Sequence, residues 1–545
     1  MPTQYELESV EGLSLEQQAL LIHALQSAAV FDDQADSIEV LETHISWVIL
    51  AGDYAYKFKK AVNFGFLDFS TLQKRHFYCQ EELRLNRRFA PWLYLDVVCI
   101  TGSVMQPEIN GQGEPLEFAV KMRRFSQDCL LGELAAERRL LPGHVDEIAV
   151  LLARIHDTVD RAGADTDFGH AEEIHHWVLD NFSQIKAALQ PTDVKPELGR
   201  LKSWCQEEFS AVRAQLEQRR KNGFVRECHG DMHLGNLALV GGQITPFDCI
   251  EFNPKLRWID VMSEAAFLVM DLLDRGYGGL AYRFLNGYLQ RTGDYPGLRV
   301  LRYYLVYRAL VRAKVAALRL VQSARGSDDR AAARRDFDGY NNLATNWAVA
   351  PAPCMLIMHG VSGSGKSWYA SQLVEKLGAI QLRSDIERKR LYGYRADANT
   401  GSDVQAGIYS RSASEKTYAQ LARLAESVIA GGLPVIVDAA FLRLDERQRF
   451  RHLAQSCHVP FAILHLDADE PTLIARIARR RQLGNDPSEA GIGVLKKQLA
   501  TQETLAASEL ADVLHIQEAA ASSLDSLVRR LRKKCSSSSG QQTLS

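Results

Sequence analysis

The chain has 545 residues, of which 46% are hydrophobic and 24% charged, and its formal net charge is −3. This length exceeds what one hydrophobic core supports, and the near-neutral charge gives no overall attraction to nucleic acid or to an anionic membrane. No apolar run approaches the ~20 residues that span a bilayer. The nine cysteines form no C-x-x-C pair, and the N-terminus, with Glu6, Glu8 and Glu11, lacks a secretory signal. We therefore expect a cytoplasmic protein with reduced thiols.

The first 125 residues contain several strand-like segments. Alternating apolar residues predict strands at 38–41, 47–50 and 54–58, separated by short polar turns. A helix is expected over 71–89, because Pro91 lies just beyond it. Strands at 97–101 and 117–123 follow, joined by a turn at 110–113. The pattern is mostly helical from 130 to about 220, and helical again from Asp260 to about 321.

A kinase-like catalytic loop is the first motif with chemical content. His229-Gly230-Asp231 is followed by Asn236, five residues after the aspartate, which is the spacing of the protein-kinase H-R-D-x-x-x-x-N loop. In that loop the aspartate orients the acceptor hydroxyl and the asparagine binds magnesium. Asp248 follows the strand-like segment 243–247 and takes the place of the DFG aspartate. The spacing predicts that Asp231 is catalytic and that Asn236 and Asp248 bind Mg²⁺.

A lysine upstream of this loop completes the set of residues expected for phosphoryl transfer. Tyr54-Ala55-Tyr56-Lys57 parallels the V-A-I-K strand of kinases, so Lys57 is expected to contact the phosphates of ATP. Lys59, on the same strand face, is the alternative lysine. The partner carboxylate should lie on the next helix, where we prefer Glu82 to Glu81. Each residue alone is compatible with turn or surface chemistry, but the ordered set indicates phosphoryl transfer.

The pattern His-Gly-Asp-x-His-x-x-Asn, with the segment 152–156 and Asp260, resembles the aminoglycoside phosphotransferase and choline kinase-like family over about residues 30–320. The resemblance implies an α+β protein-kinase-like fold, adenine docking at 121–125, and a bracing role for Asp260 at the catalytic loop. Two departures stand out. The glycine-rich loop is replaced by Thr43-His44-Ile45-Ser46. The sequence after Asp248 does not support the regulatory conformational flip that the DFG segment makes in protein kinases. Glu251 is a further candidate for the metal shell.

The polar stretch 323–335 and Pro351-Ala352-Pro353 bracket the best domain boundary. We expect a phosphotransferase-like domain at 1–340, with lobes at about 30–125 and 126–325. A linker at 341–352, a P-loop domain at 353–532 and a disordered tail at 533–545 follow.

The C-terminal half contains a Walker A motif, Gly360-Val361-Ser362-Gly363-Ser364-Gly365-Lys366-Ser367. An apolar strand, 355–358, runs into it and a helix, 368–377, is expected after it. The glycines and serines turn backbone N–H groups towards the phosphates at the positive end of the helix. Lys366 is expected to contact the β and γ phosphates, and Ser367 to bind Mg²⁺ through its hydroxyl.

Three further segments suit a P-loop kinase. Asp438 ends a strand at 433–437 and is expected to hold Mg²⁺, although a turn cap is the alternative. Asp385 follows a strand at 379–382, where a carboxylate can accept the proton of an attacking hydroxyl; an N-cap is the alternative. Arg388, one turn later, is placed to neutralise phosphate charge. Arg480 lies in the basic run 476–481 before the loop 486–488, which suits either a lid on ATP or a solvated basic face.

This order of motifs resembles the small P-loop kinases, which include gluconate kinase, zeta-toxin-like kinases and the kinase domain of polynucleotide kinase, over about residues 352–530. The resemblance implies an α/β fold with a parallel sheet between helices, and places Asp385 at the substrate hydroxyl. Together the halves resemble a group of fused bacterial proteins in which an aminoglycoside-phosphotransferase-like domain precedes a P-loop kinase-like domain.

We expect a bifunctional phosphotransferase that uses ATP and Mg²⁺ to phosphorylate hydroxyl groups of small molecules. One alternative makes one domain a nucleotide-binding switch for the other. A second makes the C-terminal half a nucleic-acid 5′-hydroxyl kinase, which the near-neutral charge and the lack of interleaved aromatic and basic residues disfavour. The acceptors are not defined by these motifs, because acceptor pockets are built from scattered side chains.

Overall fold

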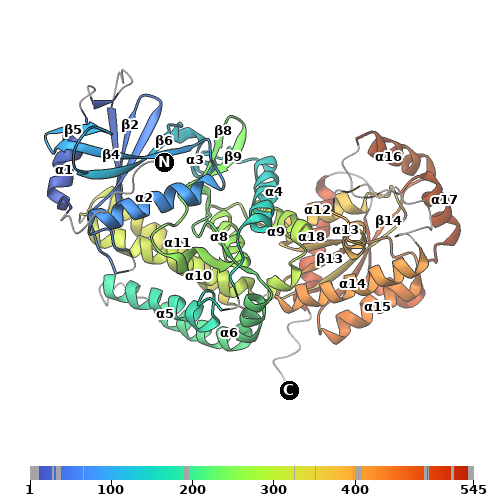
Figure 1. Cartoon of the computed structure of the whole chain (residues 1–545). Coiled ribbons are helices and arrows are strands. Elements are labelled where there is room, and N and C mark those ends of the chain that lie inside the picture. Colours follow the sequence, from blue (N-terminus) through green and yellow to red (C-terminus); the bar gives the residue numbers. More distant parts are fainter. Residues whose placement is uncertain are drawn as a thin grey trace. The chain divides into compact units, whose positions relative to one another are not determined.

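The computed structural model divides the chain into two compact units. Figure 1 draws the whole chain with its helices and strands labelled. The first comprises residues 1–140, 158–169 and 223–264, and the second comprises 141–157, 170–222 and 265–545. The N-terminal acidic residues Glu6, Glu8 and Glu11 lie outside the described part of the chain. The structure describes residues 12–26, 30–31, 38–65, 67–163, 165–189, 196–324, 326–349, 352–396, 398, 408, 410–483, 488, 490–516 and 521–537.

The first unit is built on a six-stranded antiparallel sheet of order β1-β2-β3-β6-β4-β5. The predicted strands are confirmed, and β5 is an additional one that pairs with β4 just before the turn at 110–113. The segment that forms β5 contains proline and two polar residues, which weakens its strand signal. The bounds are β1 Ile38–Glu42, β2 Ser46–Ala51, β3 Tyr54–Lys59, β4 Tyr94–Ser103, β5 Gln106–Ile109 and β6 Glu117–Arg123.

Helix α2, Leu72–Arg87, packs on β4 and β6 and brings its inward face to the site. It begins at Thr71, whose hydroxyl accepts a hydrogen bond from Lys74 N (3.2 Å), as is usual for an N-cap. Its apolar face joins a buried cluster with residues of both strands. Because Glu82 lies on the same buried face, the helix carries a carboxylate into the interior.

The rest of the first unit supports the catalytic loop, which lies between β7 and β8. β7 pairs with β10, and β8 pairs with β9, both antiparallel. These two-stranded ladders fix both ends of the loop. The bounds are α1 Leu15–Ala24, α3 Leu131–Ala136, β7 Val225–Glu227, β8 Leu237–Val240, β9 Gln243–Pro246, α7 Pro254–Arg257 and β10 Trp258–Asp260.

Long helices begin the second unit, in agreement with the predicted helical pattern. Helix α11 packs along α10 and buries Ala333, Phe337, Tyr340 and Ala344. The segment 341–348, expected to be a linker, is therefore the last part of a packed helix. The bounds are α4 Pro142–Thr158, α5 Ala171–Ala188, α6 Pro196–Lys221, α8 Val261–Asp274, α9 Gly278–Thr292, α10 Leu298–Gln322 and α11 Asp328–Ala348.

A five-stranded parallel sheet of order β12-β13-β11-β14-β15 completes the second unit. Its central strands are buried along almost their whole length, as is typical of a parallel sheet covered on both faces. The strands are β11 Met355–His359, β12 Ile380–Arg383, β13 Val435–Asp438, β14 Phe461–Leu466 and β15 Val513–Ile516. The helices are α12 Lys366–Leu377, α13 Ser384–Leu391, α14 Arg411–Ala430, α15 Leu444–Ser456, α16 Glu470–Leu483, α17 Ile492–Thr501 and α18 Ala521–Ser537.

Helix α18 also corrects the expected tail. Residues 533–537 belong to this helix, and 538–545 lie outside the described residues. None of the described helices is long and apolar enough to cross a membrane.

Candidate active sites

The first site is organised around Glu82, whose side chain is fully buried on α2. Its carboxylate accepts hydrogen bonds from Lys57 Nζ (2.8 Å) and Lys59 Nζ (2.7 Å), both on β3. Burial acts to raise the pKa of Glu82, but the two ammonium groups outweigh burial and lower it. The glutamate is therefore ionised and holds both lysines.

Each lysine also contacts a second carboxylate from the segment after β9. Lys57 contacts Asp248, and Lys59 contacts Glu251, which is 5% exposed. Burial alone would lower the pKa of Lys57, but the carboxylates around it raise it well above its usual value. The structure thus places Glu251, the additional metal-shell candidate, against Lys59. The other glutamate considered as a partner for Lys57, Glu81, contacts Arg84 (2.9 Å) instead.

The catalytic loop brings Asp231 and Asn236 into contact. Asn236 Nδ2 donates to Asp231 Oδ2 and to the Asp231 carbonyl, both at 2.9 Å. The ring of His229 is buried, which lowers its pKa, and its Nε2 lies 2.8 Å from the Phe247 carbonyl oxygen. A neutral imidazole must donate through that nitrogen, so His229 fastens the loop to the strand end before Asp248.

Gly230 is required by the geometry of the loop. Its φ is +89°, and a Cβ at this position would lie 2.8 Å from the Leu256 carbonyl oxygen. Its N–H donates to Glu264 Oε1 (2.7 Å). Asp260, for which the resemblance implied a bracing role, accepts a hydrogen bond from Met262 N (2.9 Å) at the start of α8. Glu264, which accepts the hydrogen bond from Gly230, lies one turn later on α8.

Asp248 is held beside the catalytic loop by its backbone. Phe247 N donates to the Asn236 carbonyl (3.1 Å), and Asp248 N donates to Tyr94 Oη (2.9 Å). Asp248 has a φ of +62°, which is strained for a residue with a side chain. The carboxylates of Asp231 and Asp248 and the amide of Asn236 therefore come from neighbouring backbone segments, and such oxygen ligands suit Mg²⁺.

A cavity of about 450 Å³ lies where β6 ends. The turn after β2 and the segment after Arg123 line it, and Arg124 N donates to the Asp53 carbonyl (2.8 Å). The segment expected as the adenine hinge, 121–125, reaches this cavity through Arg124 and Phe125. The lining residues are Glu39, Leu50, Gly52, Asp53, Arg124, Phe125, Ser126 and Gln127.

The second site is the phosphate loop between β11 and α12. Gly360, Gly363 and Gly365 have φ values of +147°, +87° and +91°. A Cβ would lie 2.5 Å from the Leu466 carbonyl oxygen at Gly360, and 2.8 Å from the Leu473 carbonyl oxygen at Gly363. Only glycine fits such positions. Helix α12 begins at Lys366, so the backbone N–H groups of its first turn are directed at the loop.

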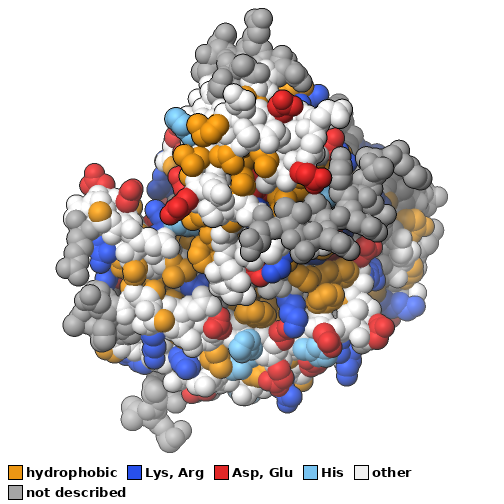
Figure 2. All heavy atoms as spheres, turned by 60° about the vertical axis from the view of Figure 1, so that its left-hand side comes forward, with side chains coloured by type: hydrophobic (Ala, Val, Ile, Leu, Met, Phe, Trp, Pro, Cys, Tyr) orange, Lys and Arg blue, Asp and Glu red, His pale blue; other side chains and the backbone are white. Residues whose placement is uncertain are grey.

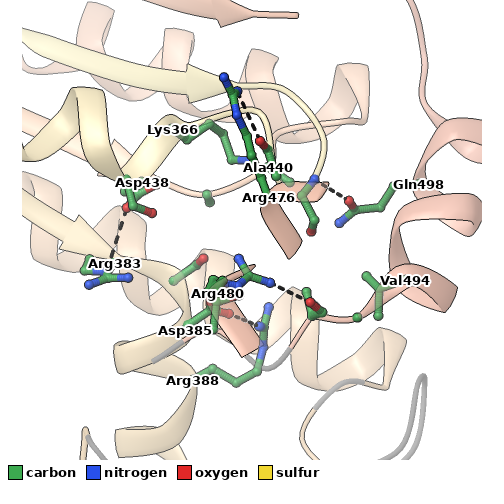
Figure 3. A pocket seen from close by; sticks show the side chains of 18 of the residues that line it. Lys366, Arg383, Asp385, Arg388, Asp438, Ala440, Arg476, Arg480, Val494 and Gln498 are labelled. Atoms are coloured by element: carbon green, nitrogen blue, oxygen red, sulfur yellow. Dashed lines mark hydrogen bonds and ion pairs between the residues drawn. The ribbon is translucent and has the colours of Figure 1, made fainter. Parts of the chain in front are cut away.

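A cavity of about 610 Å³ opens over this loop (Figure 3). Figure 3 shows Lys366 and Asp438 in its upper part and Asp385, Arg388 and Arg480 in its lower part. Most of the predicted site residues line it; Ser364, in contrast, is buried within the loop. The predicted residues that line the cavity are Ser362, Gly363, Gly365, Lys366, Ser367, Asp385, Arg388, Asp438 and Arg480.

The electrostatics of this cavity favour a bound anion and a metal. Burial, with a further contribution from Arg480, lowers the pKa of Lys366 to about 8, against the opposing effects of Asp438 and Asp385. Burial also raises the pKa of Asp438, which Arg383, a hydrogen bond from Ser367, and Lys366 oppose. A hydroxyl and a carboxylate in contact are typical Mg²⁺ ligands, and phosphate groups would restore a full charge on the lysine.

Asp385 is not an N-cap. It is the second residue of α13, whose N-cap is Arg383, and Arg388 NH1 lies 3.2 Å from its Oδ1. In the basic run, Arg476 donates to the Gly363 carbonyl (3.5 Å) and Arg480 donates to the Ala490 carbonyl. Residues 486 and 487 of the expected lid loop lie outside the described residues.

Three polar residues at this site were not predicted. Gln381 Nε2 donates to Asp438 Oδ2 (2.9 Å), and Gln498 Oε1 accepts from Ser362 N (2.7 Å). Asn286, on α9, donates to the Ala379 carbonyl (2.9 Å) and accepts from Gln381 N (2.7 Å), so its amide completes the edge of β12. Gln381 could have been noticed because it is a glutamine within an apolar strand. The contacts of Gln498 and Asn286 join segments that are far apart in the sequence.

Family models match both halves of the chain. Residues 81–304 match the family model described as the phosphotransferase enzyme family, and residues 355–505 match the model of an AAA domain. The fold and the sites define a kinase-like phosphotransferase region followed by a P-loop kinase-type domain.

Related proteins align with most of the length of this chain. An uncharacterized protein of Mycobacterium tuberculosis strain H37Rv is 30% identical over 455 residues, which cover 84% of this chain and 88% of the relative. An uncharacterized protein of Mycobacterium bovis matches to the same extent. The chain belongs to the same family as these mycobacterial proteins.

Solved structures match each half separately. A choline/ethanolamine kinase family protein from Mesorhizobium loti is 12% identical and covers 61% of this chain and 99% of its own, with a TM-score of 0.37. A gluconokinase from Sinorhizobium meliloti is 22% identical and covers 34% of this chain and 98% of its own, with a TM-score of 0.23.

Proposed function

We propose that the chain is a bifunctional, cytoplasmic phosphotransferase that uses ATP and Mg²⁺ at both sites to phosphorylate hydroxyl groups of small molecules. The observation that carries this proposal is that each site has its own lysine, metal-ligand oxygens and candidate base. The division into domains at 1–340 and 353–532 is kept as part of the proposal.

In the first site, Asp231 orients the acceptor hydroxyl, and Asn236 and Asp248 hold Mg²⁺. Lys57, positioned by Glu82 (2.8 Å), contacts the phosphates of ATP. The contact of Lys57 with Asp248 gives way when Mg²⁺ occupies that carboxylate and phosphate occupies the ammonium group.

In the second site, the loop from Gly360 to Ser367 binds the phosphates, and Ser367 and Asp438 hold Mg²⁺. Asp385 accepts the proton of the acceptor hydroxyl, while Arg388 and Arg480 neutralise developing charge. Oriented groups of this kind accelerate phosphoryl transfer mainly by positioning and electrostatics.

A nucleic-acid 5′-hydroxyl kinase is the less favoured alternative. On the face drawn in Figure 2, basic and acidic side chains of the described residues are interspersed, without one broad basic surface. The chain's formal net charge of −3 likewise gives no overall attraction to a polyanion.

The proposal is tested with a metabolite extract incubated with ATP, Mg²⁺ and purified full-length protein. Mass spectrometry follows compounds that gain about 80 daltons, the mass of one added phosphoryl group. Asp231→Ala should abolish one set of products and Lys366→Ala another. If both variants keep every product of the wild type, the proposal is wrong. If Lys366→Ala only changes the rate of products that depend on Asp231, the second domain is a switch.

A further inference from the structure

One face of helix α9 contacts three segments of the P-loop site. Arg283 donates a hydrogen bond to Glu375 on α12 (2.8 Å). Asn286, three residues later, contacts β12, and the carbonyl of Gln290 accepts a hydrogen bond from Arg390 on α13 (2.6 Å). Residues three and four apart lie on one face of a helix. This face of α9 therefore supports the phosphate-loop helix, β12 and α13 together.

Asn286 lies at the centre of this face, and its side chain is 5% exposed. Its Nδ2 donates to the Ala379 carbonyl (2.9 Å), and its Oδ1 accepts from Gln381 N (2.7 Å). β12 is an edge strand of the parallel sheet, and on its inner side Ile380 N donates to the Pro434 carbonyl (2.8 Å). The outward N–H and C=O groups of a buried edge strand need partners. The amide of Asn286 supplies them and fixes the position of β12.

The position of β12 affects two groups of the proposed reaction. Gln381 Nε2 donates to Oδ2 of Asp438, the proposed Mg²⁺ ligand (2.9 Å), and both side chains are buried. A hydrogen bond to a ligating carboxylate fixes its orientation and thereby tunes metal affinity. Because α13 follows β12 without an intervening residue, the strand also sets the position of Asp385 in the first turn of that helix.

We propose that Asn286 is a positioning residue for the P-loop reaction and that, through Gln381, it holds Asp438 in the orientation that binds Mg²⁺. This inference rests on the proposed function of that site. Asn286 lies within residues 81–304, the segment that matches the phosphotransferase enzyme family. The metal site of the P-loop domain therefore depends on a side chain of the phosphotransferase-like region, and the two halves of the chain are not independent catalysts.

The test is calorimetric titration of a non-hydrolysable ATP analogue into full-length protein carrying Asp248→Asn, which is intended to silence the first site. Each variant is titrated with excess Mg²⁺ and again with EDTA, and the ratio of the two affinities measures the contribution of the metal. Asn286→Ala should reduce this ratio ~5-fold, less than the tenfold or more that is typical of a side chain in direct contact with a metal ligand. The affinity in EDTA should stay within about twofold, because the phosphate loop and Lys366 are unchanged. A general loosening of the site would instead lower both affinities equally.

Asn181→Ala is the matched control. Asn181 lies on α5, is also buried, and donates to the carbonyl four residues earlier (2.9 Å), as Asn286 does (2.8 Å). Helix α5 packs on α6 and α10, so this substitution should leave the ratio unchanged.

A double variant tests whether Asn286 acts through Gln381. Asn286→Ala combined with Gln381→Leu should give the same ratio as Gln381→Leu alone, because the effects of residues that act in series do not add. The unfolding temperature and the affinity in EDTA establish that each variant is folded. If Asn286→Ala does not fold, Asn286→Ser takes its place, because the shorter serine side chain cannot make both hydrogen bonds.

The inference would be overturned by an unchanged ratio in the Asn286 variant or by an equal fall in Asn181→Ala. Independent, multiplicative effects of the Asn286 and Gln381 substitutions would also overturn it. If nucleotide binding does not depend on Lys366, the proposed function itself fails. If binding depends on Lys366 and the ratio does not respond to Asn286, only the positioning role of Asn286 is rejected.

Discussion

The lowered pKa of Lys366 predicts how nucleotide binding at the P-loop site depends on pH. Burial is the main cause and brings this pKa to about 8. Phosphate groups hold the lysine in its charged form, so binding takes up a proton whenever the free lysine is neutral. The affinity for nucleotide is therefore greatest well below pH 8 and falls as the pH rises through this value. For a bound-state pKa above ~10, the loss between about pH 7.5 and about pH 9.5 is ~25-fold, or ~1.9 kcal/mol.

Calorimetry with MgADP measures this dependence in full-length protein carrying Asp248→Asn, which is intended to silence the first site. Lys366→Arg is the control, because an arginine does not titrate in this range. Burial lowers the pKa of the neighbouring His359 to about 3, so this ring stays neutral throughout. The reasoning would be refuted if the affinity for MgADP did not change with pH in the protein that retains Lys366. It would also be refuted if the affinity fell equally in Lys366→Arg.

Two further variants test the surroundings of the same site. Gly363→Ala places a Cβ at 2.8 Å from the Leu473 carbonyl oxygen at a φ of +87°, which should destabilise the protein by about 2 kcal/mol in thermal unfolding. Gly199→Ala is the control, because an added Cβ meets open space at this position on α6; it should stabilise the protein by ~0.5–1 kcal/mol. An equal effect of Gly363→Ala and Gly199→Ala would contradict the packing argument. Gln381→Leu removes the hydrogen bond to Asp438 (2.9 Å) and should weaken Mg²⁺ binding with nucleotide about tenfold; unchanged Mg²⁺ titrations would show that Gln381 does not position the carboxylate.

The sequence predicts the elements whose signals are local. The phosphate loop follows from a strand, three glycines and a helix within about two dozen residues, and the structure places these elements as expected. The loop at His229 is equally local, since Asp231 and Asn236 lie five residues apart and make contact (2.9 Å).

Contacts between segments that are distant in the sequence could not be predicted, because they leave no local signal. Asn286 completes the edge of β12 across almost a hundred residues, and Glu264 accepts a hydrogen bond from the distant Gly230 N–H (2.7 Å). Composition was also misleading at 341–348, because a polar stretch can still bury one face of a helix such as α11.

Nucleotide stoichiometry tests the central claim, two phosphoryl-transfer sites in one chain, most directly. Titration of full-length protein with Mg²⁺ and a non-hydrolysable ATP analogue should give about two bound nucleotides per chain, as one complete ligand set per site requires. Lys366→Ala and Asp248→Ala should each reduce this to about one, and the double variant to none. A single bound nucleotide in the wild type, abolished by one variant and unaffected by the other, would contradict the account.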